Sequence, residues 1–220
     1  MNSRPLLTRV LLLAAIAVGA TLVIYFGFLK PSDALPIIHP ADLDVRLSDK
    51  RARQNQDEHH ILDFHLFDQT GDTITLADTR GKIRVADFFF TTCTSICPKM
   101  SMNMVRVQEA FKDDDRVVLL SHSVTPEMDS VPVLAEYAKL HNADPRRWHL
   151  MTGDRRQIYR LARNSWFAAL DEGDGGPDDF VHTENFVLAD TLGRLRGFYD
   201  GTNTKEVDRL IADMHKLLEE

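Results

Sequence analysis

The chain of 220 residues is long enough for one ordinary domain and a targeting segment, and its 44% hydrophobic and 27% charged residues are those of a globular protein. Its formal net charge is −7, and the first thirty residues carry only Arg4, Arg9 and Lys30, which leaves 23 basic against 33 acidic residues beyond them. Such a surface repels phosphates, so composition argues against nucleic acid as a partner and favours a cation or a basic protein surface.

The first predicted element is a membrane helix. Residues 10–28 carry no charge and are almost wholly apolar, and a helix of that length spans roughly 28 Å, enough to cross the hydrocarbon core of a bilayer. Bulky residues at 24–26 follow the small-residue pattern Ala15–Ile16–Ala17, which favours an uncleaved signal anchor over a cleaved signal peptide. Because Arg4 and Arg9 precede it, we expect the domain on the far side of the inner membrane, in the periplasm or an equivalent space.

The stretch after this helix is predicted to be a tether, because it contains three prolines and a mixed-charge run and shows no long apolar period. The folded domain is expected to begin near Ile61. The predicted organisation is a cytoplasmic N-terminus over 1–9, a transmembrane signal anchor over 10–29, a polar tether over 30–59 and one folded domain over 60–220.

The domain is predicted to alternate strands and helices. It opens with a hairpin of 61–67 and 73–76 around a turn at 69–72. The further elements are strands at 82–90, 116–124 and 148–152, helices at 98–112, 129–141 and 155–164, a hairpin of 185–189 and 195–199, and an amphipathic helix at 204–218. This order predicts an α/β fold with a central sheet flanked by helices. A cysteine pair between the main strand and the next helix points to the thioredoxin-like architecture.

The only two cysteines, Cys93 and Cys97, are spaced C-x-x-x-C where the apolar strand ends and a helix begins. Amides at a helix N-terminus favour negative charge, so at least one sulfur is expected to ionise readily. Residues i and i+4 share a helix face, so both sulfurs can converge on one soft ion. The pair can therefore close a disulfide or hold a metal. A purely structural disulfide is disfavoured, because so small a loop gains little stability.

The run 87–98, an aromatic strand followed by Cys93, Cys97 and a proline, resembles the signature of the Sco (SenC) family. Residues 123–126, S-V-T-P, look like that family's S-V-D-P loop, and residues 181–190 look like its histidine-bearing loop and strand. The resemblance implies a thioredoxin-like copper metallochaperone whose ligands are Cys93, Cys97 and His182. It also implies a recipient, the copper-binding subunit of cytochrome c oxidase, whose binuclear copper centre such proteins help to assemble.

The implied ligand set is chemically sensible. Thiolates suit Cu(I), an added imidazole tolerates Cu(II), and three ligands leave an open position through which a recipient can take the ion. Two positions depart from the family pattern. Thr125 replaces the usual aspartate of the S-V-D-P loop, and Val181 replaces the acid that often precedes the histidine. These departures bear on docking and redox tuning more than on the metal ligands.

Two other functions are open. As a thiol–disulfide reductase, the redox pair Cys93 and Cys97 keeps the recipient's copper-ligand cysteines reduced. As a thiol peroxidase, Thr94 and Cys97 supply a T-x-x-C pattern, although Phe90 stands where such enzymes carry a proline. Other candidate ligands have plainer interpretations. They are an exposed polar pair for His59 and His60, core packing for Met100 and Met104, and a solvated loop for the acidic residues at 171–179.

Overall fold

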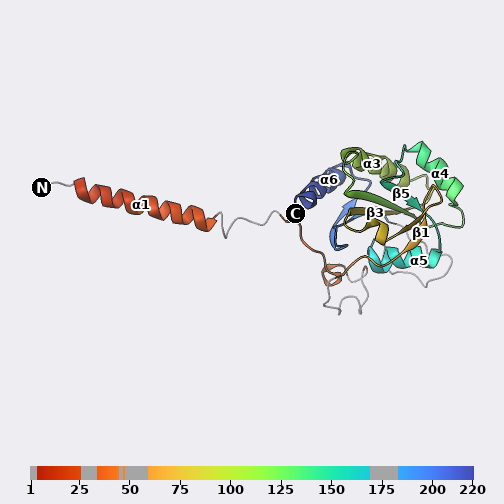
Figure 1. The fold of residues 1–220 in the computed structure, drawn as a ribbon, viewed down its shortest axis with the longest axis horizontal. Coiled ribbons are helices and arrows are strands. Elements are labelled where there is room, and N and C mark those ends of the chain that lie inside the picture. The colour runs from red at the N-terminus through yellow and green to blue at the C-terminus, as the bar shows by residue number, and fades with distance from the viewer. Residues whose placement is uncertain (1–3, 26–33, 45–46, 48–58, 169–182) are drawn as a thin grey trace. The chain divides into compact units, whose positions relative to one another are not determined.

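The computed structural model describes residues 4–25, 34–44, 47, 59–168 and 183–220, and the chain forms two compact units, Met1–Ala34 and Leu35–Glu220 (Figure 1). The first unit contains the helix α1 (Arg4–Ile24). Among the described residues, no helix is both long enough and apolar enough to span a membrane. The membrane span predicted over 10–29 stays a prediction.

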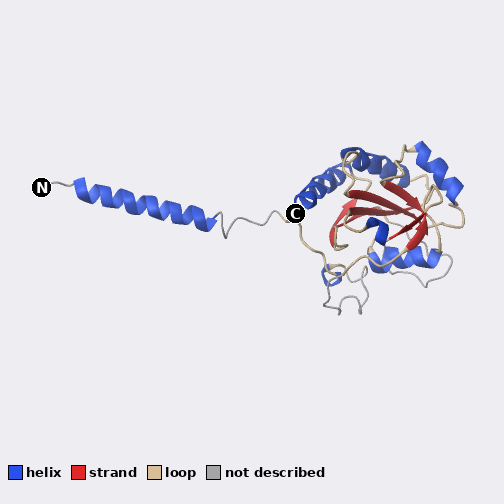
Figure 2. Ribbon diagram, viewed as in Figure 1, coloured by secondary structure: helices blue, strands red, loops and turns tan. Residues whose placement is uncertain are grey.

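The second unit is built on a five-stranded sheet of order β5-β4-β3-β6-β7 (Figure 2). Its parallel half contains β3 (Ile83–Phe89), β4 (Val117–Ser123) and β5 (Trp148–Met151), and its antiparallel half contains β6 (Asn185–Ala189) and β7 (Leu195–Asp200). Every residue of β3 and β4 is buried. Strands covered on both faces are rich in apolar residues, and this enrichment is why the sequence predicts these two strands so closely.

Helices cover both faces of this sheet. Figure 1 shows α3 (Cys97–Ala110) and α4 (Val131–Leu140) on one side and α5 (Arg155–Arg160) on the other. The helix α6 (Thr204–Glu219) packs with α3, and α5 continues as a π-helical turn, Leu161–Ser165. A separate hairpin of β1 (His65–Phe67) and β2 (Thr73–Thr75) shares the core on the α5 side, and a short 3-10 turn, Ala77–Thr79, follows it. The predicted α/β fold, a central sheet flanked by helices, is confirmed.

Alternation along β3 decides which side chains face the α3 side. Val85 and Phe89 belong to the core beneath α3 and α6, whereas Ala86 and Phe88 belong to the core beneath α5. Because side chains alternate along a strand, Asp87 also faces the α3 side. The chain then leaves β3 and turns directly into α3, so the cysteines lie over this same face.

The folded unit begins earlier than the predicted position 60. Ile38 donates its backbone N–H to the carbonyl of Leu195 over 2.8 Å, which adds the segment to the free edge of β7, and the 3-10 turn Pro40–Asp42 follows. The buried guanidinium of Arg196 donates to the carbonyls of Leu35 (2.7 Å) and Pro36 (3.2 Å). These long-range partners explain why a stretch with no apolar period of its own is nevertheless ordered.

Candidate functional site

The cysteines lie on the turn that joins β3 to α3. Cys97 is the first residue of α3 and Pro98 the second, a position where the missing N–H of proline costs nothing. The first amides of a helix lack intrahelical acceptors, and Ile96 at the N-cap offers no side-chain acceptor. The Cys97 N–H donates instead to Cys93 Sγ over 3.4 Å. The first sulfur therefore caps the helix that carries the second.

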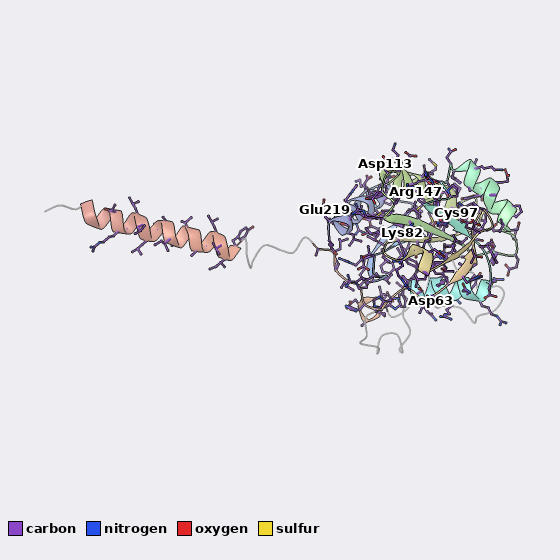
Figure 3. All side chains as sticks on the ribbon, viewed as in Figure 1. Asp63, Lys82, Cys97, Asp113, Arg147 and Glu219 are labelled. Carbon is purple, nitrogen blue, oxygen red and sulfur yellow. The ribbon has the colours of Figure 1, made fainter. Side chains whose placement is uncertain are left out.

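Both thiols are free and almost fully buried, with Cys93 8% and Cys97 3% exposed. Figure 3 labels Cys97, which belongs to the core cluster formed with α3 and α6. Cys93 Sγ lies 3.5 Å from the hydroxyl of Ser95. The pair thus lies just beneath the surface, because Thr92 and Thr94, on either side of Cys93, are exposed.

The two thiols differ in acidity. Burial raises the pKa of Cys93, but hydrogen bonds from the Cys97 and Ser95 side chains and from their backbone amides outweigh it and bring that pKa to about 7. Burial, together with the hydrogen bond to Cys93, raises the pKa of Cys97 to about 12. Near neutral pH the pair is therefore one partly ionised sulfur beside one thiol. This agrees with the prediction that at least one sulfur at the helix entrance ionises readily.

A buried carboxyl group that sequence reasoning missed lies on the same side of the sheet. Asp87 is 3% exposed, accepts a hydrogen bond of 2.5 Å from Ser121, and Ser121 in turn accepts one of 2.8 Å from Trp148 Nε1. Burial raises the pKa of Asp87 to about 7, and its charge contributes to the raised pKa of Cys97. The signal was visible as a single acid within an apolar strand, where an ionisable group is costly.

The third candidate ligand, His182, and its neighbour Val181 lie outside the described residues. The described chain resumes at Thr183, which is 8% exposed, and enters β6 at Asn185. The antiparallel register Ala86↔Val187 directs the start of β6 toward the end of β3. Thr183 therefore lies at the same end of the sheet as the turn that carries Cys93.

Thr125, the departure from the family pattern, has a definite partner. Its hydroxyl donates to Oδ2 of Asp129 over 3.0 Å, and its backbone N–H donates to the hydroxyl of Ser123 over 3.2 Å. Asp129 is fully buried. An ionised aspartate at position 125 has no proton to donate, so threonine is the better neighbour for this carboxylate.

The other candidate ligands have structural partners. His59 Nε2 lies 2.8 Å from the Ser165 carbonyl, and His60 Nδ1 lies 3.0 Å from the Leu192 carbonyl. Met100 and Met104 are fully buried in the core, in agreement with their plainer interpretation. The acidic residues at 171–179 lie outside the described residues. Within the described ranges, no cluster of three or more His, Cys, Asp or Glu side chains could hold a metal ion.

The SCO1/SenC family model matches residues 52–219. A SCO1/SenC family lipoprotein from Bacillus anthracis is 29% identical, with a TM-score of 0.64 over 76% of this chain and 98% of its own. BsSco, a member of the Sco family of cytochrome c oxidase assembly proteins in which a disulfide switch was identified, is 28% identical, with a TM-score of 0.61 over 74% and 96%. Bradyrhizobium japonicum ScoI, solved with copper bound, is 24% identical and shares the fold, with a TM-score of 0.58 over 72% and 99%. Because the family match covers well over half of the chain, the protein belongs to the SCO1/SenC family and has its thioredoxin-like fold.

Proposed function

We propose that this chain binds copper through Cys93, Cys97 and His182 and delivers it during assembly of the copper centre of cytochrome c oxidase, whose copper-binding subunit is the recipient. The observation that carries the proposal is the reduced, adjacent sulfur pair at the entrance of α3, with one sulfur ionising near neutral pH. Membership of a family that includes cytochrome c oxidase assembly proteins and copper-bound structures supports it.

The donor set fits copper as a cargo. Two thiolates and an imidazole are ligands that soft Cu(I) accepts, and the imidazole widens the set to Cu(II). Copper binding requires both sulfurs to lose their protons, and the raised pKa of Cys97 means that the metal must displace this proton. Affinity is therefore expected to rise with pH through the neutral range, as the Cys93 thiol ionises.

The test is a titration of the reduced full chain with Cu(I) and Cu(II), followed by gel filtration and metal analysis. We expect about one copper per chain, and we expect His182→Ala to weaken retention while leaving both thiols reactive. The matched control is His215→Ala, because His215 is an exposed histidine that packs on Phe111 at the far end of α3. Equal copper retention in both variants would show that His182 is not a ligand.

A thiol–disulfide reductase is the second candidate, and the unequal acidity of the two thiols favours it. The Cys93 thiolate attacks one sulfur of the recipient's disulfide and releases the other as a thiolate. Cys97 then loses its proton, attacks the mixed disulfide at Cys93, and leaves the recipient with two thiols and this chain with a Cys93–Cys97 disulfide. Mixing the reduced chain with an oxidised, copper-free recipient tests this role. Failure to reduce the recipient with both cysteines intact contradicts it.

A thiol peroxidase fits less well. In the T-x-x-C pattern the attacking cysteine is Cys97, and its pKa is raised to about 12 by burial and by the hydrogen bond to Cys93. The thiolate is the nucleophile in such chemistry, so Cys97 is poorly suited to attack peroxide at neutral pH. Peroxide consumption coupled to a thiol donor measures this activity directly.

We further propose that residues 10–29 anchor the domain to the inner membrane, with the domain facing the periplasm or an equivalent space. The support comes from the uncharged apolar run and the preceding Arg4 and Arg9. Carbonate extraction of membranes tests the anchor, and protease protection of intact spheroplasts tests the orientation. Release of the full chain into the carbonate supernatant contradicts the proposal.

A further inference from the structure

A second buried carboxylate lies next to the cysteine turn. Asp129 is fully buried, and its Oδ1 accepts the hydroxyl of Thr91 over 2.5 Å. Its Oδ2 accepts the backbone N–H of Thr91 over 3.2 Å, the hydroxyl of Ser123 over 2.5 Å and the hydroxyl of Thr125 over 3.0 Å. One side chain thus takes four hydrogen bonds from two separate segments.

These donors lie at the carboxyl ends of the two adjacent parallel strands β3 and β4. Thr91 lies two residues after the end of β3 and two before Cys93, whereas Ser123 is the last residue of β4 and Thr125 follows it. The adjoining backbone is also paired, because the Val124 N–H donates to the Phe89 carbonyl over 2.8 Å. Asp129 therefore ties the cysteine turn to the loop after β4.

We propose that Asp129 is a positioning residue for the cysteine pair, which acts through Thr91 to hold the turn so that Cys93 stays buried against the first amide of α3. The proposal rests on the proposed function where it concerns copper, since a turn fixed in this way brings both sulfurs to the metal already arranged. Groups that orient metal ligands in this manner commonly affect metal affinity about 10- to 100-fold when they are removed.

If Asp129 only stabilised the fold, then removing any comparable buried carboxylate should affect the cysteines equally. Asp68 is the matched control. Asp68 is 2% exposed, and its Oδ1 accepts the backbone N–H and hydroxyl of Thr70 and the N–H of Asp72. It organises the β1–β2 turn, which shares the core on the opposite side of the sheet from the cysteines. Asp68→Asn therefore removes a comparable buried carboxylate without touching the cysteine turn.

The experiment measures the rate at which iodoacetamide modifies Cys93 in the reduced, metal-free full chain at pH 9. At this pH most of the Cys93 thiol is ionised, so the rate reports mainly its exposure. Asp129→Asn and Thr91→Val are expected to speed modification several-fold by releasing the turn. Thr91→Ser, which keeps the hydroxyl, and Asp68→Asn are expected to match the wild type. Thr91→Val keeps the carboxylate and serves as the second variant if Asp129→Asn does not fold.

Cu(I) affinity, measured by competition with a chromophoric chelator, supplies the second readout. We expect Asp129→Asn to bind about 10-fold more weakly or worse, and Asp68→Asn to bind like the wild type. Equal modification rates in Asp129→Asn and the wild type, or equal changes in Asp129→Asn and Asp68→Asn, overturn the positioning role. A wild-type chain that binds no copper overturns the proposed function instead, and the modification rates still decide the role of Asp129.

Discussion

The hydrogen bond between the two thiols is the feature whose removal has the most direct chemical consequence. Among the interactions that lower the pKa of Cys93, the hydrogen bond from the Cys97 side chain is the largest. Burial, which raises this pKa, is the only larger effect. Cys97→Ala removes this donor, so the pKa of Cys93 is expected to rise from about 7 toward the ordinary 9.0. Cys97→Ser keeps a hydroxyl donor at the same place and is expected to shift it less.

The expected change in alkylation rate follows from the ionised fraction of Cys93 at the two pKa values, about 7 and 9.0. At pH 7, a thiol whose pKa is about 7 is half ionised, whereas one whose pKa is 9.0 is roughly 1% ionised, a loss of about 50-fold in thiolate. A more basic thiolate is also more nucleophilic, by about 8-fold over this range for a Brønsted coefficient of about 0.45. Complete loss of the shift therefore slows alkylation at pH 7 by about 6-fold. In the variant the Ser95 bonds still lower the pKa of Cys93 while burial still raises it, so the 6-fold slowing corresponds to a full return to 9.0.

The assay is the thiolate absorbance near 240 nm, or the alkylation rate, followed from pH 5 to 11. Either Cys97 variant contains a single cysteine, so the titration belongs to Cys93 without ambiguity. We expect the pKa of Cys93 to be lowest in the wild type, higher in Cys97→Ser and highest in Cys97→Ala. If Cys97→Ala titrates at the wild-type value, the bond between the thiols is not what lowers the pKa of Cys93.

Three further predictions concern stability and are measured by urea unfolding. Burial raises the pKa of Asp87 from 3.8 to about 7, so the free energy of unfolding should fall by up to roughly 4 kcal/mol as pH rises through this interval. Asp87→Asn should abolish this pH dependence. An unchanged pH dependence in the variant would contradict the raised pKa of Asp87. Arg196→Ala removes a buried cation from two carboxylates and two carbonyls and should lower the free energy of unfolding by about 3–5 kcal/mol. Lys139→Ala, at an exposed ion pair, should lower it by less than about 1 kcal/mol. Similar losses in the two variants would show that the buried contacts of Arg196 do not stabilise the fold. Met104→Ala, in the core at 0% exposure, should cost about 2–5 kcal/mol, and Met102→Ala, at 67% exposure, should have little effect.

Local pattern was enough to predict most of the fold. The strands predicted at 82–90 and 116–124 form as β3 and β4 within one residue at each end, because both are rich in β-branched, aromatic and other apolar residues. The helix predicted at 155–164 ends its regular part at Arg160 and continues as a π-helical turn, which has no distinct sequence pattern. The segment around Ile38 has the sequence pattern of a tether, because its partners, Leu195 and Arg196, are remote in sequence.

The cysteine pair was predictable because its position and spacing are local. The residues that surround it were not, because their roles depend on contacts between segments far apart in the chain. Asp129 reads as an ordinary acid before a helix, and only the fold reveals that it accepts hydrogen bonds from Thr91 across the strand ends. The ligand role of His182 follows from the family resemblance and stays a prediction, because His182 lies outside the described residues.

X-ray absorption at the copper edge identifies the atoms bound to the metal in the loaded full chain, and therefore tests the proposed copper ligands themselves. We expect two sulfur scatterers and one imidazole nitrogen, with the imidazole signal lost in His182→Ala and kept in His215→Ala. A spectrum of the wild type that lacks sulfur, or an imidazole signal that survives in His182→Ala, contradicts the ligand set of Cys93, Cys97 and His182.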